Sequence, residues 1–184
     1  LPPDGDGEYW SVDMPGQAVA WIGIERIIQA FRLIELRAKR WNCTRIDLAF
    51  DTQTFSVEQF WQVVGDAEGA FRSYVHRDKI QRWHSADGSG DTVYMGAAGS
   101  LSRLRVYKKH IEEHEVFGDD TFTRVELVVR AQRASALLVT LMTLPLDQWA
   151  DKSAGLLRSF VDLQVDWWQD WLSGVHSWGG AFQQ

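Results

Sequence analysis

The stretch from residue 101 to residue 109 reads LSRLRVYKK, so apolar and charged side chains alternate along it. Side chains of a β-strand alternate between its two faces, and this pattern therefore predicts a strand with one apolar and one charged face. Two further stretches repeat the pattern, CTRIDLAFD at 43–51 and TRVELVVR at 123–130. If these strands are neighbours, helices cover the apolar face of the sheet and the opposite face presents charged residues.

The rest of the chain predicts an α+β protein. Apolar spacing indicates a helix at 24–40, and Ser56 suits the N-cap of another helix that runs to about residue 67. Further elements are expected as strands at 8–23 around the Pro15-Gly16 turn, at 91–97 and at 121–130, and as helices at 109–116 and 134–144. A loop-rich section separates the helix that begins at Ser56 from the strand at 91–97.

We expect one domain with a mainly antiparallel sheet and helices packed on one face. The divisions that we predict are a disordered lead-in at 1–7, the α+β domain that carries the chemistry at 8–145, and a Trp-rich helical segment at 146–184 packed on or continuing that domain. The last segment contains Trp149, Trp167, Trp168, Trp171 and Trp178, which either stack on DNA bases or close the core, and we favour the core. Trp83 carries no separable signal.

Composition limits the function classes. The formal net charge is -6, and residues 1–24 carry four acids and no Lys or Arg, which is a weak electrostatic footprint for a nucleic-acid protein. The single cysteine, Cys43, excludes an internal disulfide framework and a thiolate zinc site. No apolar run is long enough to span a bilayer and no signal peptide is visible, so we expect a cytoplasmic protein without a membrane partner.

The charged face of the predicted sheet has two interpretations. In the first, it is a solvated face on which Asp47 pairs with Arg45 or Arg124, and Glu126 pairs with Arg105. In the second, it is a reaction site, because strand propensity does not favour acids placed centrally in strands.

The second interpretation fits phosphodiester transfer. Carboxylates on one face suit Mg²⁺ or Mn²⁺, which prefer oxygen ligands. Tyr107 lies on the same face and becomes a nucleophile when a metal polarises the phosphate and a cation such as Lys109 favours the phenolate. Arg103 and Arg105 could hold the non-bridging phosphate oxygens. The product would be a 5′-phosphotyrosine link and a free 3′ hydroxyl.

The run GDTVYMGAAGSLSRLRVYKKHIEEHE, together with TRVELVVR, resembles the replication initiation factor family, a group of tyrosine nickases of rolling-circle plasmids, phages and integrative elements. The upstream RIDLAFD and the tail VDWWQDWL resemble further segments of that family. The matching positions are Gly90, Thr92, Tyr94, Gly96, Ser102, Arg105, Tyr107, Lys109, Glu112 or Glu113, Arg124 and Glu126.

This resemblance implies a metal-dependent initiator that nicks and joins single-stranded or hairpin origin DNA. The implied catalytic residues are Tyr107, Lys109 and Arg105; the implied metal ligands are Asp47 and Glu126, completed by Glu112 or Asp51; and the implied DNA contacts are Arg103, Arg124 and Lys108. Origin DNA is the expected partner, with a host helicase and a second copy of the chain as further candidates.

Two alternatives stay open. The chain could be a DNA-binding relative, or a fragment, that keeps the fold without cutting. His110, Glu113 and His114 also spell H-x-x-E-H, an inverted zinc-protease pattern, although a charged turn after a strand explains it more simply. No phosphate-binding loop of the G-x-x-x-x-G-K-[ST] type is present, and Cys43 is expected to be a small buried hydrophobe.

Overall fold

The structure is a computed structural model that describes residues 11–38, 41–66, 69–84, 90–109 and 122–177. Contacts between residues divide the chain into two compact units, the first ending at Trp41 and the second beginning at Asn42. Among the described helices, none is both long and apolar enough to cross a membrane.

The first unit consists of two helices, α1 (Gly16–Ile22) and α2 (Ile24–Arg37). Helix α2 confirms the helix predicted from apolar spacing, but the two strands predicted within 8–23 are wrong where the structure describes the chain. Pro15, with φ -63° and ψ 154°, lies directly before the first turn of α1, a place that proline tolerates because it needs no N–H donor there. Gly23, with φ +86°, separates the two helices.

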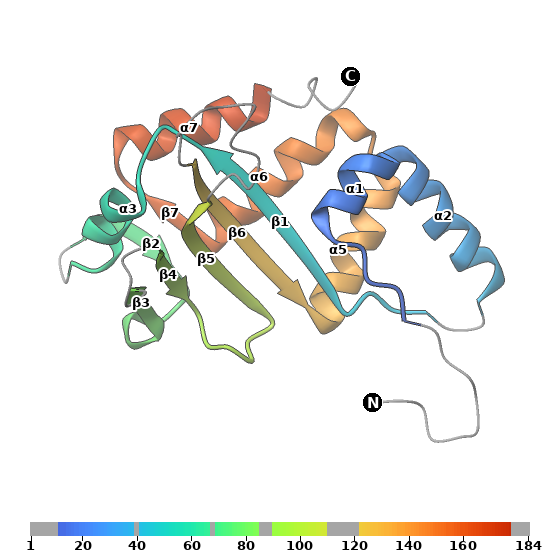
Figure 1. Ribbon diagram of the computed structural model, residues 1–184, viewed down its shortest axis with the longest axis horizontal. Coiled ribbons are helices and arrows are strands. Elements are labelled where there is room, and N and C mark those ends of the chain that lie inside the picture. The colour runs from blue at the N-terminus through green and yellow to red at the C-terminus, as the bar shows by residue number, and fades with distance from the viewer. Residues whose placement is uncertain (1–10, 39–40, 67–68, 85–89, 110–121, 178–184) are drawn as a thin grey trace. The chain divides into compact units, whose positions relative to one another are not determined.

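The second unit contains a five-stranded sheet in the order β1-β6-β5-β4-β3, in which every pair of neighbours is antiparallel. Its strands are β1 (Arg45–Thr52), β3 (Ile80–His84), β4 (Asp91–Met95), β5 (Ser102–Lys109) and β6 (Phe122–Arg130). A two-stranded sheet pairs β2 (Phe71–Ser73) with β7 (Val161–Leu163). The α+β class with a mainly antiparallel sheet is therefore confirmed (Figure 1).

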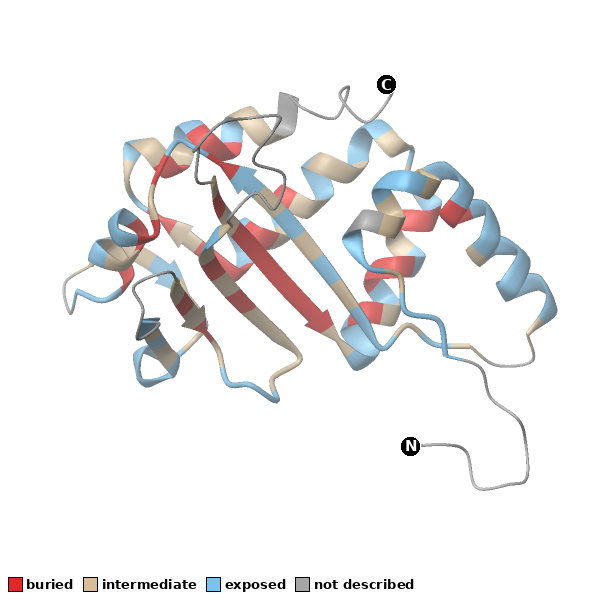
Figure 2. Ribbon diagram, viewed as in Figure 1, coloured by how far each residue is buried: buried red, intermediate tan, exposed pale blue. Residues whose placement is uncertain are grey.

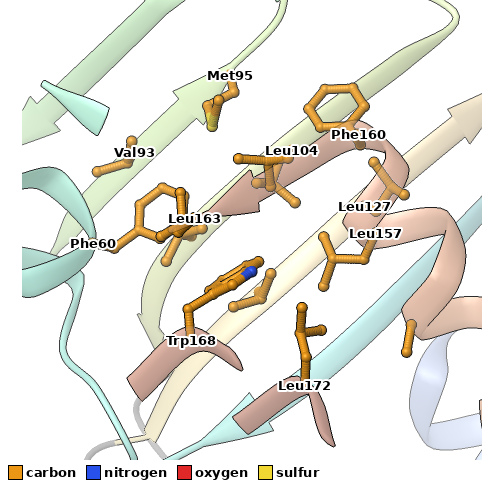
Figure 3. Packing of buried hydrophobic residues seen from close by; sticks show 14 of the residues in the cluster. Phe60, Val93, Met95, Leu104, Leu127, Leu157, Phe160, Leu163, Trp168 and Leu172 are labelled. Carbon is orange, nitrogen blue, oxygen red and sulfur yellow. The ribbon is translucent and has the colours of Figure 1, made fainter. Parts of the chain in front are cut away.

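Helices cover one face of the large sheet. They are α3 (Val57–Val64), α5 (Ala131–Thr143), α6 (Trp149–Phe160) and α7 (Asp166–Ser177), with short 3-10 turns at Arg77–Lys79 and Leu146–Gln148. Their apolar side chains meet those of the strands in one core, where Phe60, Leu104, Leu127 and Trp168 are fully buried (Figure 3). Strand β6, which lies between β1 and β5, is buried along most of its length (Figure 2).

The tryptophans of the C-terminal segment belong to this core. Trp168 is fully buried, and the ring of Phe55 lies 4.7 Å from Trp167 and 5.2 Å from Trp171 between centroids. Trp149 is half-buried against the same cluster. The core interpretation of these four residues is therefore confirmed, whereas Trp178 lies outside the described residues.

Three further expectations differ from the structure. The section expected to be rich in loops contains β2 and β3, and the helical tail is interrupted by the strand β7. Strand β3 was not predicted because its apolar–polar alternation is broken by Arg82, a charged residue at an inward position. There Arg82 pairs with Glu58 and Asp91. The helix expected at 109–116 begins at a residue that is the end of β5, and 110–116 lie outside the described residues.

Helix α3 begins as the sequence predicts, at a Ser56 cap. The Ser56 hydroxyl accepts a hydrogen bond from the backbone N–H of Gln59 at 3.2 Å, and the Gln59 side chain accepts one from the Ser56 N–H at 2.8 Å. This reciprocal capping box satisfies two N–H groups that a helix end otherwise leaves without partners.

We expect Ser56→Ala to destabilise the protein by about 1 kcal/mol, because the Gln59 N–H loses its acceptor. Thermal unfolding should then show a melting temperature lower by about 2–4 °C. Ser159→Ala is the matched control, since Ser159 is exposed within α6 and its hydroxyl only donates, to the Leu156 carbonyl. Equal melting temperatures for the two variants would contradict the importance of the cap.

Candidate active site on the polar face of the sheet

We call the face of the large sheet opposite to the helices the polar face. Its residues alternate with the core residues along each strand and are Arg45, Asp47, Ala49, Asp51, Gln81, Trp83, Thr92, Tyr94, Arg103, Arg105, Tyr107, Lys109, Phe122, Arg124, Glu126, Val128 and Arg130. The register places Tyr107 opposite both Thr92 and Arg124, and Arg105 opposite both Tyr94 and Glu126. The sequence pattern on β1, β5 and β6 thus predicted which side chains share this face.

The centre of the polar face is a contact between Tyr107, Glu126 and Arg105. The phenol of Tyr107 donates a hydrogen bond to Oε2 of Glu126 at 3.1 Å, while Arg105 forms an ion pair with Oε1 of the same carboxylate. Glu126 is only 5% exposed, so these two partners replace the water that a carboxylate normally binds. The Arg105 guanidinium also lies 5.7 Å from the centre of the Tyr107 ring.

Burial raises the pKa of the Tyr107 phenol, and the negative charge and hydrogen bond of Glu126 raise this pKa further. The positive charges of Arg124 and Arg105 oppose the effect without reversing it. The expectation that Lys109 favours the phenolate is not met in this arrangement, because the Lys109 ammonium pairs instead with Asp51 at 3.4 Å. Without a metal or substrate, Tyr107 is therefore held as a neutral phenol.

Asp51 on β1 is linked to Arg124 on β6, the residue opposite Tyr107. Its carboxylate accepts two hydrogen bonds from Arg124, at 2.5 Å from Nε and 2.6 Å from Nη2. Burial alone would raise the pKa of Asp51, but the hydrogen bonds and charges of Arg124 and Lys109 outweigh that effect and lower this pKa. Arg124 is thus fixed beside Tyr107 by a carboxylate on a different strand.

The metal ligands expected from the sequence share the polar face but do not converge. Asp47 and Asp51 each lie two residues from Ala49, which is opposite Glu126, so the two aspartates are about 13 Å apart along β1. One ion can therefore take Glu126 with one of these aspartates but not with both. Within the described part of the chain, no three His, Cys, Asp or Glu side chains form a metal-binding group.

The donor chemistry nevertheless suits a hard cation, since Mg²⁺ is often held by one or two carboxylates and keeps several waters. In the structure each carboxylate holds an arginine: Asp47 accepts hydrogen bonds from Arg45 at 2.7 and 2.5 Å, and Glu126 pairs with Arg105. These are the ion pairs of the solvated-face interpretation. A metal ion bound by Asp47 and Glu126 would displace the two guanidinium groups.

The expected DNA-binding residues occupy different surroundings. Arg103 stacks on Tyr94, with its guanidinium carbon 4.0 Å from the ring centre, and makes no ion pair with a carboxylate among the described residues. Arg124 is paired with Asp51. Lys108 is exposed and lies on the other side of β5 from Tyr107, in line with Leu104 and Val106. Glu112 and the residues of the H-x-x-E-H pattern, His110, Glu113 and His114, lie outside the described residues.

Two side chains of the polar face were not assigned a role from the sequence. Tyr94 carries the stacked Arg103, and Trp83 is 64% exposed on β3. Cys43 is half-buried, and burial raises the pKa of its thiol, which agrees with a structural rather than a nucleophilic role.

The fold is shared with a solved structure described as "Structure of Rolling Circle Replication Initiator Protein from Geobacillus stearothermophilus". The two chains are 22% identical, the TM-score is 0.59, and the match covers 81% of this chain and 67% of the other. Residues 41–178, well over half of the chain, match the model of the replication initiation factor family, and the chain therefore belongs to this family. A search of curated proteins found no match.

The contact between Tyr107 and Glu126 makes a prediction about titration. In metal-free buffer, Glu126→Gln should lower the pKa of Tyr107, because the variant removes the negative charge that disfavours the phenolate. The pKa can be followed by the ultraviolet absorbance of tyrosinate, with Tyr107→Phe identifying which of the tyrosines titrates. An unchanged or raised Tyr107 pKa in Glu126→Gln would show that the two groups are not in contact.

Proposed function

We propose that this chain initiates rolling-circle replication by nicking and rejoining one strand of origin DNA, with Tyr107 as the nucleophile. The observation that carries the proposal is the position of the Tyr107 hydroxyl, hydrogen-bonded to buried Glu126 between Arg105 and Arg124. Membership of the replication initiation factor family and the fold shared with a rolling-circle initiator support it.

The reaction is an exchange of one phosphate ester for another. The Tyr107 oxygen attacks the phosphorus, the bond between phosphorus and the 3′ oxygen breaks, and a 5′-phosphotyrosine link and a 3′ hydroxyl result. Glu126 is the nearest acceptor for the phenol proton, and a proton from solvent completes the leaving 3′ hydroxyl. Attack of a 3′ hydroxyl on the phosphotyrosine reverses the step and rejoins the strand.

The arginines around Tyr107 serve the phosphate. Arg105 and Arg124 flank the phenol, where their donors can meet the non-bridging oxygens as negative charge develops on them. Arg103 lies farther along β5 and is free of carboxylates among the described residues, so it contacts a neighbouring phosphate. Lys108, on the opposite side of the strand, would reach DNA only beyond the end of the sheet.

Mg²⁺ or Mn²⁺ would be held by Glu126 and Asp47, with Glu112 acting through water, because Asp51 lies about 13 Å along β1 from Asp47 and cannot share the ion. When bound, the ion supplies positive charge that polarises the scissile phosphate. The release of Arg105 and Arg45 from these carboxylates would leave both guanidinium groups available for phosphate oxygens.

A DNA-binding relative that does not cut is the second candidate. It is favoured by the raised pKa of Tyr107 and by the arginine partners of Glu126, Asp51 and Asp47. Both candidates bind origin DNA, preferably single-stranded or hairpin DNA, because the net charge of -6 leaves little positive surface for duplex DNA.

Covalent capture distinguishes the two candidates. When the chain is incubated with Mn²⁺ and a labelled single-stranded library, a band should appear that survives a denaturing gel, and sequencing of the linked DNA should show a defined site. Tyr107→Phe should reduce this band to background, because no oxygen remains to form the ester. Tyr94→Phe is the control and should keep the link, since only the ring of Tyr94 is used, by Arg103.

A link that survives Tyr107→Phe would assign the nucleophile elsewhere. If the wild-type chain binds the library but forms no link at any metal concentration, the non-cutting relative is the correct function.

Metal binding should also be visible without any cleavage. A divalent cation that binds only the folded state stabilises it by mass action, so Mn²⁺ at roughly 100 times its Kd should raise the melting temperature by about 5–10 °C. Glu126→Gln should remove this increase, whereas Asp78→Asn, which changes an exposed carboxylate paired with Lys79, should keep it. An increase that persists in Glu126→Gln, or that is absent in the wild type, would contradict the proposed metal ligands.

A further inference from the structure

Trp83 lies on the polar face but has no role in the reaction proposed at Tyr107. It lies on β3, an edge strand of the large sheet, and its side chain is 64% exposed. Tryptophan is on average a highly buried residue, and the four tail tryptophans that the structure describes follow that rule in the core. Trp83 instead leaves a large aromatic surface in solvent on the face that carries the nucleophile.

The register places Trp83 in line with Tyr107. Trp83 is opposite Thr92 on β4, and Thr92 is opposite Tyr107 on β5. Neighbouring strands are about 4.8 Å apart, so the backbones of Trp83 and Tyr107 are separated by roughly 10 Å. Stacked nucleotides rise about 3.4 Å each, and a strand with its phosphate at Tyr107 reaches Trp83 within a few nucleotides.

Two other aromatic rings of the polar face, those of Tyr94 and Tyr107, already have a cation. Arg103 covers Tyr94, and Arg105 lies over Tyr107. Among the described residues, the Trp83 ring contacts neither another aromatic ring nor a cation. Phe122, opposite Lys109, is half-buried, so the Trp83 indole is the most exposed aromatic surface that this face offers to a base.

Strand β3 is anchored by the residue before Trp83, whose side chain lies on the opposite face of the strand. Arg82, the preceding residue, points toward the helices, where it pairs with Glu58 of α3 and with Asp91 at 2.6 Å. Its side chain is only 12% exposed, and its guanidinium lies 5.9 Å from the Trp61 ring. Because side chains alternate along a strand, this anchor directs Trp83 to the polar face before any ligand binds.

We propose that Trp83 is a stacking platform for an unpaired base of the DNA strand, a few nucleotides from the phosphate that Tyr107 attacks. The inference rests on the proposed function for its substrate, single-stranded DNA. Every base has a π-face, so such a platform holds the strand in place without reading its sequence. Its role is to position the scissile phosphate, and it takes no part in the chemistry.

Binding of the full chain to two strands of equal length, an oligothymidylate and an abasic strand, tests the platform. The two strands carry the same phosphates but only the first has bases. Wild-type protein should prefer the oligothymidylate, and Trp83→Ala should bind it about 5- to 100-fold more weakly while binding the abasic strand as before. Trp83→Phe should be intermediate, because a smaller aromatic ring remains.

The matched control is Tyr74→Ala. Tyr74 is also a largely exposed aromatic residue, but its ring packs edge-on against Phe160, at 5.1 Å between centroids, and it is not on the polar face. Its removal should leave both affinities unchanged. Melting temperatures establish that the variants are folded. If Trp83→Ala is not folded, Trp83→Phe is compared with the wild type in its place.

Three results overturn the platform: equal binding of the two strands by the wild type, unchanged binding of oligothymidylate by Trp83→Ala, or equal weakening for both strands. The nickase is judged separately by covalent capture at Tyr107. A link at Tyr107 with no effect of Trp83→Ala rejects the platform alone, whereas base-dependent binding through Trp83 without any link rejects the nickase alone.

Discussion

The register between β5 and β6 is the constraint on which the polar face depends. It places Leu104 opposite Leu127 and Val106 opposite Val125 on the helix side, and all four residues are essentially without exposure to solvent. A shift of one residue would turn these side chains toward the polar face and bury charges in their place. The core thereby fixes the alignment of Arg105 with Glu126 and of Tyr107 with Arg124 on the opposite side.

Electrostatic balance within the polar face follows from that alignment. Arg105 and the Tyr107 hydroxyl replace the water that the buried Glu126 side chain would otherwise bind, and removal of one partner would leave a buried polar group without compensation. Asp51 balances Arg124 in the same way from β1. The Tyr107 phenol is therefore neutral and Arg105 and Arg124 are paired with carboxylates, and any ligand of these groups must exchange such partners.

The sequence predicts which residues share the polar face better than it predicts the contacts between them. Period-two alternation places Asp47, Tyr107 and Glu126 on one side of a sheet, because strand geometry alone determines this. Which carboxylate each arginine chooses depends on the pairing of strands distant in sequence, and the contact of Tyr107 with Glu126 instead of with Lys109 could not be predicted. The exposure of Trp83 could not be predicted either, because it depends on the position of β3 at the edge of the sheet. Arg82 occupies an inward position of β3, so this strand lacks the apolar–polar alternation by which it could have been predicted.

The strand order has one more consequence, for the behaviour of the free protein at high concentration. Strand β1 is hydrogen-bonded to β6 on one side and is the last strand of the large sheet, and such edges can pair with the edge of another molecule. Arg45, Asp47 and Asp51 give this edge strand charges of both signs along its polar side. Fixed charges on an edge discourage the addition of a foreign strand, so the charged residues of β1 also protect the sheet from aggregation.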